Sequence, residues 1–160
     1  MITPLLPEHG PAVEDLLDRA FGTDRHARTA YLVRGAAQAI PALGFVATEK
    51  NAIVGSVQCW PVALHLDAGG MVPLVMVGPV AVAPDRQRSG LGRSLTATAI
   101  DAAGDDAALC LIGDPEYYGR FFGFSAQRTS AWRLPGPVER HRLLARGTAV
   151  PDAAGMLGPR

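Results

Sequence analysis

The sequence has little cysteine and no metal-binding spacing, which excludes two common ways of stabilising a fold. Its 160 residues include two cysteines, Cys59 and Cys110, both in apolar, strand-like stretches. They can pair only if the fold brings them together, and we expect buried free thiols in a reducing cytoplasm. The four histidines are scattered without Cys/His spacing. We therefore predict neither a structural zinc site nor another bound metal.

The sequence also lacks a net charge and a long apolar run. Lysine plus arginine and aspartate plus glutamate each number 15, so the formal net charge is +0. Nucleic-acid-binding surfaces normally carry a basic excess, so no nucleic-acid partner is expected. No apolar run reaches the length of a membrane span, and the N-terminus shows no export signal. We expect a cytoplasmic protein without a membrane partner.

The composition is that of one folded domain. The hydrophobic fraction is 48% and the charged fraction 19%, which is typical of a globular protein and not of a disordered one. A chain of this length fits a single domain over residues 1–160. Residues 146–160 are poor in bulky apolar side chains, and we expect them to form a loosely ordered tail.

The order of apolar stretches predicts an α+β (α/β) protein with a mixed sheet. Tight turns at 50–51 and 67–70 join three strands in antiparallel order, and a later apolar stretch follows a helix, as a parallel neighbour would. The tail segment 139–146 fits either a helix or an edge strand. The expected strands cover residues 1–6, 44–48, 52–66, 71–82, 107–112, 124 onward and 131–134. The expected helices cover residues 8–21, 25–34, 91–102 and 116–122.

Residues 80–95, VAVAPDRQRSGLGRSL, combine the end of a buried strand, an arginine-rich turn and the start of a helix. The first amides of such a helix have no internal partner and, with the helix dipole, favour an anion such as phosphate. Gly90 and Gly92 allow a ligand to approach the backbone. No GK[ST] follows, which argues against a nucleoside triphosphate, and position 95 is Leu, which breaks a dinucleotide fingerprint.

The order of residues in this turn carries a family resemblance. The run Gln87-Arg88-Ser89-Gly90-Leu91-Gly92 resembles the Q/R-x-x-G-x-G/A signature of the GNAT superfamily of acetyl-CoA-dependent N-acetyltransferases. The resemblance implies a mixed, mostly antiparallel sheet of six to seven strands, flanked by about four helices and splayed between the fourth and fifth strands. It also implies acetyl-CoA as cosubstrate, bound by Val80, Ala81, Val82, Gln87, Arg88, Ser89, Gly90, Leu91, Gly92, Arg93, Asp114 and Tyr118.

Gly78-Pro79 stands inside the predicted central strand. Proline cannot donate to a strand ladder, so a bulge or a local break in pairing is expected there, unless the strand simply ends early. In proteins of the resembled family, the equivalent strand is bulged and splays from its neighbour to admit the pantetheine arm.

A second run, 114–124, supports the resemblance independently. Its sequence, DPEYYGRFFGF, resembles the D-P-x-Y-Y-x-R-F-G-F run of a bacterial subgroup of predicted acetyltransferases. The family's tyrosine donates a proton to the departing thiolate, which places Tyr118 in that role, with Tyr117 as the substitute. One extra phenylalanine in 121–122 departs from the pattern and turns a helix by about 100°. Either a bulge absorbs it, or the tyrosines face differently.

The resemblance implies direct acetyl transfer to an amine of a small molecule or peptide by a monomer or homodimer. The sequence does not identify the acceptor. Asp114, Glu116, His65 and a water relay all remain candidates for the general base that deprotonates the amine. The Trp60 side chain either packs in the core or lines the acceptor pocket. The alternative function is a non-catalytic acyl-CoA-binding or sensing module of the same fold.

Overall fold

The two longest apolar stretches form adjacent strands, β3 (Ala52–Leu66) and β4 (Met71–Val82), around which the sheet is ordered. The computed structural model describes residues 1–160. Six of the eight strands follow the order β1-β2-β3-β4-β5-β7; of the other two, β8 pairs with β3 and β6 pairs with β8. The β2–β3 and β5–β7 pairs are antiparallel, and β4–β5 is parallel. The mixed, mostly antiparallel sheet with four α-helices is therefore confirmed, with eight strands instead of the expected six to seven.

Apart from the helix expected over residues 25–34, the other elements lie close to their predicted ranges in the first two thirds of the chain. The remaining strands are β1 (Ile2–Pro4), β2 (Phe45–Glu49), β5 (Leu109–Ile112), β6 (Trp132–Arg133), β7 (Leu143–Arg146) and β8 (Gly155–Pro159). The α-helices are α1 (Gly10–Phe21), α2 (Thr29–Arg34), α3 (Leu91–Ala103) and α4 (Pro115–Phe122). Short 3-10 helices cover Pro7–His9, Arg25–Ala27, Pro41–Leu43, Pro84–Arg86 and Arg140–Arg142. No described helix has both the length and the apolar character needed to cross a bilayer.

The chain forms two units, and β3 and β4 contribute to both. The first unit comprises residues 1–26, 39–59 and 77–104; the second comprises residues 27–38, 60–76 and 105–160.

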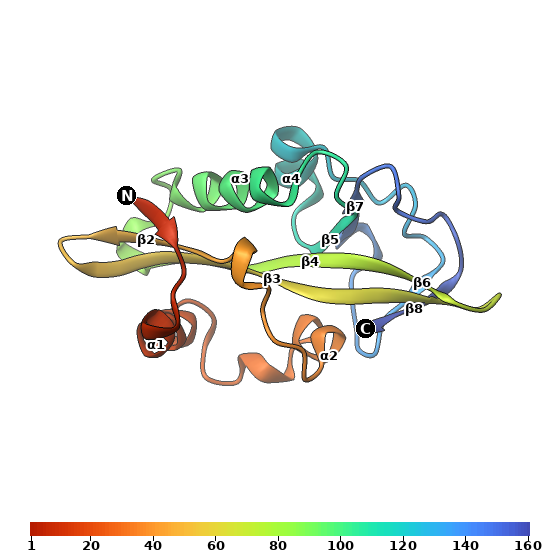
Figure 1. Cartoon of the computed structure of the whole chain (residues 1–160), viewed down its shortest axis with the longest axis horizontal. Helices are drawn as coiled ribbons and strands as arrows, with labels where there is room; N and C mark the ends of the chain where they lie inside the picture. The colour runs from red at the N-terminus through yellow and green to blue at the C-terminus, as the bar shows by residue number, and fades with distance from the viewer. The chain divides into compact units, whose positions relative to one another are not determined.

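In the first unit, two helices cover opposite faces of the strands (Figure 1). Val13, Leu16 and Leu17 of α1 pack with Val46 and Ala81, and all five side chains are fully buried. On the other face, Gly55 makes room for α3: an added Cβ would lie 2.8 Å from Leu95 Cδ1 and 3.2 Å from Leu91 Cδ2. The missing side chain on β3 thus allows the first turns of α3 to approach the sheet closely.

The helix expected over residues 25–34 is divided in two. Arg25 lies in the separate 3-10 turn, where its buried guanidinium binds Asp18 at 3.0 Å and Glu14 at 2.5 Å, both on α1. This pairing directs Arg25 toward the preceding helix, and α2 begins only at Thr29. Tertiary ion pairs therefore override the local periodicity here.

The last residues differ from the expected loose tail. Gly155–Pro159 forms β8, which pairs antiparallel with Val62–Leu66 of β3, and Leu157 is buried. Gly155 is required by the close approach, since an added Cβ would lie 2.5 Å from the His65 carbonyl oxygen. The small residues that suggested a loose tail instead permit close backbone pairing.

The strand expected from Phe124 onward is also wrong. Only an isolated bridge joins Ser125 to Ala145. For residues 139–146, the edge-strand alternative is correct at its C-terminal part: a 3-10 turn leads into β7, which pairs with β5.

Candidate functional site

The turn after β4 adopts the strand–loop–helix arrangement that the sequence predicts. Ala83 N–H donates to the Val54 carbonyl at 2.8 Å, which fixes the end of β4 to β3. A 3-10 turn at Pro84–Arg86 follows, and α3 begins at Leu91. Gly90, with φ of 84°, is the residue that precedes the helix in the left-handed region. Residues 87–90, between the 3-10 turn and α3, are exposed.

The first turn of α3 begins directly after the loop, at Leu91. Gly90 has no side chain to cap the helix, so N–H groups of the first turn lack an acceptor within the helix. Ser89 Oγ donates to the Arg86 carbonyl at 2.5 Å and lies 3.4 Å from the Leu91 nitrogen, at the outer limit of a hydrogen bond. Gly92 lies beside the strand: an added Cβ would be 3.5 Å from Val82 and 3.8 Å from Val80. A helix start of this kind is suited to an anion such as phosphate.

The three arginines of the loop differ in their partners. Arg86 Nε donates to Glu49 at 2.5 Å and Arg86 Nη1 donates to Asp85 at 3.2 Å, so its guanidinium ties the loop to β2. The neighbouring carboxylates raise the pKa of Arg86, with the Glu49 hydrogen bond as the main cause. Arg88 and Arg93 are exposed, and Arg88 has φ of 67°. Arg86 is therefore a structural anchor, and the two others remain the candidates for a ligand.

The predicted break at Gly78-Pro79 does not end the strand. β4 continues through both residues to Val82. The Gly78–Pro79 peptide bond is cis, and Gly78 has φ of 124°, a region that favours glycine. The proposed splay of β4 from β5 stays a prediction; the two strands pair in parallel at Val75–Leu109 and Met76–Cys110.

Helix α4 is capped at both ends, by Asp114 and by Gly123. The Asp114 side chain accepts a hydrogen bond from Glu116 N–H at 3.0 Å, and Pro115 occupies the first turn. Gly123, with φ of 73°, ends the helix and donates to the Gly119 and Tyr118 carbonyls. The helix is continuous between these caps, so no bulge absorbs the additional phenylalanine. Instead Phe121 is an exposed hydrophobic residue.

Tyr118 packs against the end of β5. An added Cβ on Gly113 would lie 2.5 Å from Tyr118 Cε2 and 2.8 Å from Cδ2, so the ring covers this glycine. Phe122 and Phe124 hold the ring from other sides, each with a centroid separation of 6.1 Å. The Tyr117 ring lies edge-on to it at 4.9 Å. The ring of Tyr118 is therefore fixed by packing on a short, capped helix.

The Tyr118 phenol is neutral at physiological pH. Burial raises its pKa to about 12, Tyr117 and Asp114 add to the increase, and the Arg142 guanidinium opposes it. Such a group can donate a hydrogen bond but does not ionise near neutrality. Neither Gly113 nor Arg142 was identified from sequence. Gly113 adjoins the tyrosine run, but Arg142 has no sequence signal that connects it with Tyr118.

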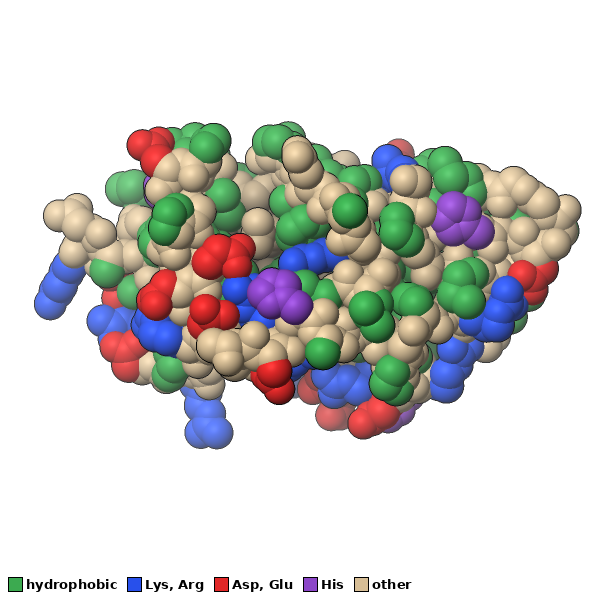
Figure 2. Space-filling model, turned by 90° about the horizontal axis from the view of Figure 1, so that it is seen from below, with side chains coloured by type: hydrophobic (Ala, Val, Ile, Leu, Met, Phe, Trp, Pro, Cys, Tyr) green, Lys and Arg blue, Asp and Glu red, His purple; other side chains and the backbone are tan.

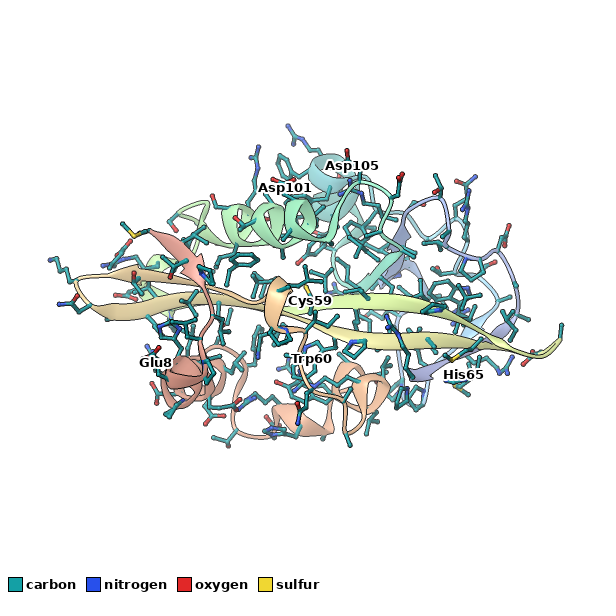
Figure 3. All side chains as sticks on the ribbon, in the orientation of Figure 1. Glu8, Cys59, Trp60, His65, Asp101 and Asp105 are labelled. Carbon is teal, nitrogen blue, oxygen red and sulfur yellow. The ribbon has the colours of Figure 1, made fainter.

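The candidate bases have other partners or lie at the surface. Asp114 is the cap of α4, and Glu116 is exposed in its first turn. His65 is exposed and its Nε2 lies 2.7 Å from the Pro159 carbonyl oxygen, beside β8 (Figure 3). Asp114 and His65 are thus occupied by structural contacts.

A further cluster in the second unit was not predicted as such. The Arg34 guanidinium lies between two aromatic rings, with its Cζ 3.8 Å from the Tyr31 centroid and 3.7 Å from the Trp60 centroid. This stacking is the cation–π geometry, so Trp60 has a packing partner that the sequence did not reveal.

The surface charge does not identify an acceptor. Figure 2 shows acidic and basic side chains interspersed on the face that it displays, in agreement with the formal net charge of +0. The loop at 83–93 belongs to the first unit and Tyr118 to the second. Both cysteines are buried and free, as expected.

Comparisons with known proteins agree with the fold. The family described as "Acetyltransferase (GNAT) domain" matches residues 2–126. The GNAT family N-acetyltransferase YhbS from Escherichia coli, solved in complex with CoA, is 25% identical with a TM-score of 0.77, over 100% of this chain and 89% of that chain. A GNAT family acetyltransferase from Brucella melitensis, solved with acetyl-CoA, is 24% identical with a TM-score of 0.59, over 93% and 96%. Among curated proteins, none matches the chain.

Proposed function

The chain belongs to the GNAT acetyltransferase family, and we propose that it transfers the acetyl group of acetyl-CoA directly to an amine of a small molecule or a peptide. The observation that supports this most strongly is the turn at 83–93. Its exposed backbone, the left-handed Gly90 and the uncapped start of α3 fit the pyrophosphate of coenzyme A. The CoA complex of the similar E. coli protein supports the same ligand.

Under this proposal, different residues of the loop and of β4 bind different parts of the coenzyme. The amides of Gly90, Leu91, Gly92 and Arg93 bind the pyrophosphate, and Arg88 adds positive charge. Gln87 and Ser89 shape the loop, and the backbone of Val80, Ala81 and Val82 contacts the pantetheine arm. Asp114 contributes through the cap of α4 rather than as a base.

Under this proposal, Tyr118 interacts with the sulfur atom that leaves as the thioester is cleaved. Attack of the amine on the thioester forms the amide bond and breaks the carbon–sulfur bond, so the nitrogen loses a proton and the sulfur gains one. With a phenol pKa of about 12 and a thiol pKa near 8.5, net proton transfer from tyrosine to thiolate is unfavourable by about 5 kcal/mol. We infer that Tyr118 donates a hydrogen bond to the sulfur and relays the proton that the amine releases.

Acetyl-CoA binding and acetyl transfer test the proposal separately. Calorimetry measures coenzyme binding, and thiol release with a panel of amines measures turnover. Binding together with amine-dependent thiol release supports the transferase. If coenzyme binds but no amine is turned over, and the Tyr118→Phe substitution changes neither result, the acyl-CoA-sensing alternative is supported instead. Absence of coenzyme binding contradicts both.

A further inference from the structure

A separate hollow lies in the second unit, and none of the residues assigned to the coenzyme lines it. Its volume is ≈ 300 Å³. The walls come from the connection between α3 and β5, the end of α4, the bridge at Ser125–Ala145 and the loop after β7. The residues that matter for its chemistry are Asp105, Gln127, Arg128, Arg146 and Thr148.

One wall of this hollow is held by backbone constraints. Gly147 has φ of 119°, and an added Cβ would collide with the Ala107 carbonyl oxygen, so the chain turns closely around that point. Arg128 Nη1 then donates to the Val150 carbonyl at 3.0 Å and lies 3.5 Å from the Thr148 carbonyl oxygen. The loop that borders the hollow is thereby fixed, and Arg128 is engaged in holding it.

Besides Arg128, which holds the loop, two opposite charges line the hollow without neutralising each other. Arg146 is half-buried at the end of β7, and its guanidinium has no hydrogen-bond or ion-pair partner within residues 1–160. Asp105 is exposed on the connection before β5, where Figure 3 shows it, and its carboxylate likewise has no partner in the described chain. A planar guanidinium favours a carboxylate as its ligand. A carboxylate such as Asp105 favours an ammonium group.

We propose that this hollow binds a free amino acid, whose carboxylate pairs with Arg146 and whose ammonium group pairs with Asp105. A ligand that carries only negative charge fits this hollow less well than an amino acid does, because the Asp105 carboxylate would repel it. The unpaired side-chain amide of Gln127 offers a further donor and acceptor. The volume of ≈ 300 Å³ lies at the lower end for ligand pockets and suits a ligand of amino-acid size. The proposal does not depend on the acetyl-transfer function.

The site also adjoins the helix that carries Tyr118. Gly123 lines the hollow and is the C-cap of α4, where its N–H donates to the Gly119 and Tyr118 carbonyls. An occupant therefore contacts the end of the helix whose packing fixes the phenol.

Calorimetry on the full chain tests the site with a panel of amino acids that includes alanine, and with two partial analogues. Propionate keeps the carboxylate of alanine and lacks the ammonium group; ethylamine lacks the carboxylate. We expect at least one amino acid to bind, and both propionate and ethylamine to bind at least tenfold more weakly than alanine or not at all. Equal binding of propionate, or binding of no amino acid, overturns the proposal.

Variants locate the binding. Arg146→Gln and Asp105→Asn should each weaken amino-acid binding at least tenfold, whereas Arg120→Gln, at an exposed arginine outside the hollow, should leave it unchanged. Arg146→Lys keeps the charge and tests the geometry if the glutamine variant folds poorly. Acetyl-CoA binding should be unaffected in all of them. Amino-acid binding that survives both Arg146→Gln and Asp105→Asn places the ligand elsewhere and contradicts the proposal.

Discussion

The ring of Tyr118 lies directly on Gly113, so close that a methyl group at position 113 would come within 2.5 Å of Cε2. Gly113 is the residue after β5, and its N–H donates to the Arg142 carbonyl at 2.9 Å. The glycine is therefore held by the 3-10 turn that precedes β7, and the tyrosine must move if a side chain is added. This contact links the end of β5 to the position of the proposed hydrogen-bond donor.

Gly113→Ala should displace the Tyr118 ring and lower kcat about 10²-fold, since small misplacements of a catalytic group have effects of that size. The crowding should also lower the unfolding free energy by about 1–3 kcal/mol. Turnover kinetics and denaturant unfolding measure the two effects.

The control is Gly10→Ala, because nothing lies within 4 Å of an added Cβ there. It should leave kcat unchanged. In a Tyr118→Phe background, Gly113→Ala should cause little further loss of kcat if it acts through the phenol. If the double variant instead loses kcat by the full product of the two single effects, Gly113 does not act through the Tyr118 phenol.

The raised pKa of Tyr118 predicts the alkaline behaviour of the enzyme. The proposed role needs the protonated phenol, and a pKa of about 12 keeps the proton in place as pH rises well past 10. An ordinary phenol would lose it near pH 10. Spectrophotometric titration of the folded protein should show a late-ionising phenol whose signal is absent from Tyr118→Phe. A fall in kcat centred below pH 10 that disappears in Tyr118→Phe would contradict this account.

The different partners of the loop arginines predict different effects on coenzyme affinity. Arg88→Ala should raise the KM for acetyl-CoA several-fold, with a smaller difference at high salt, because an exposed charge is screened. Arg86→Ala should change this KM less, since Glu49 already binds its guanidinium. KM measurements at low and high ionic strength compare them. A larger effect of Arg86→Ala than of Arg88→Ala would reverse these assignments.

The cysteines should be inert in the native state. Burial raises the pKa of both Cys59 and Cys110 to about 12, so little thiolate exists near pH 8. A thiol reagent such as Ellman's reagent should detect almost no thiol in the folded protein and both thiols after denaturation. Rapid native labelling of either cysteine would show that its strand opens readily.

Sequence reasoning predicted best where local chemistry decides the structure. The apolar runs of β3 and β4 and the short helix α4 depend on neighbouring residues, and each element lies where expected. It failed where a distant partner decides. β8 forms because β3 offers an edge, and the helix at 25–34 divides because Arg25 binds α1.

The site shows the same division. The turn with Gly90 follows from residue order, and the structure forms it as a loop and helix start. The structural role of the Arg86 guanidinium depends on its hydrogen bond to Glu49, which lies 37 positions earlier in the chain. The contact of Tyr118 with Gly113 depends on how α4 folds back on β5, which no local pattern encodes.

The central claim is acetyl transfer with Tyr118 as the donor to the leaving sulfur. Its most direct test follows radiolabelled acetyl groups from acetyl-CoA to a panel of amines, with wild type and Tyr118→Phe compared at saturating coenzyme. We predict a labelled amide product in wild type and about 10²-fold slower formation in Tyr118→Phe, with coenzyme affinity retained. No labelled amide with any amine, or an equal rate in both proteins, would contradict the account.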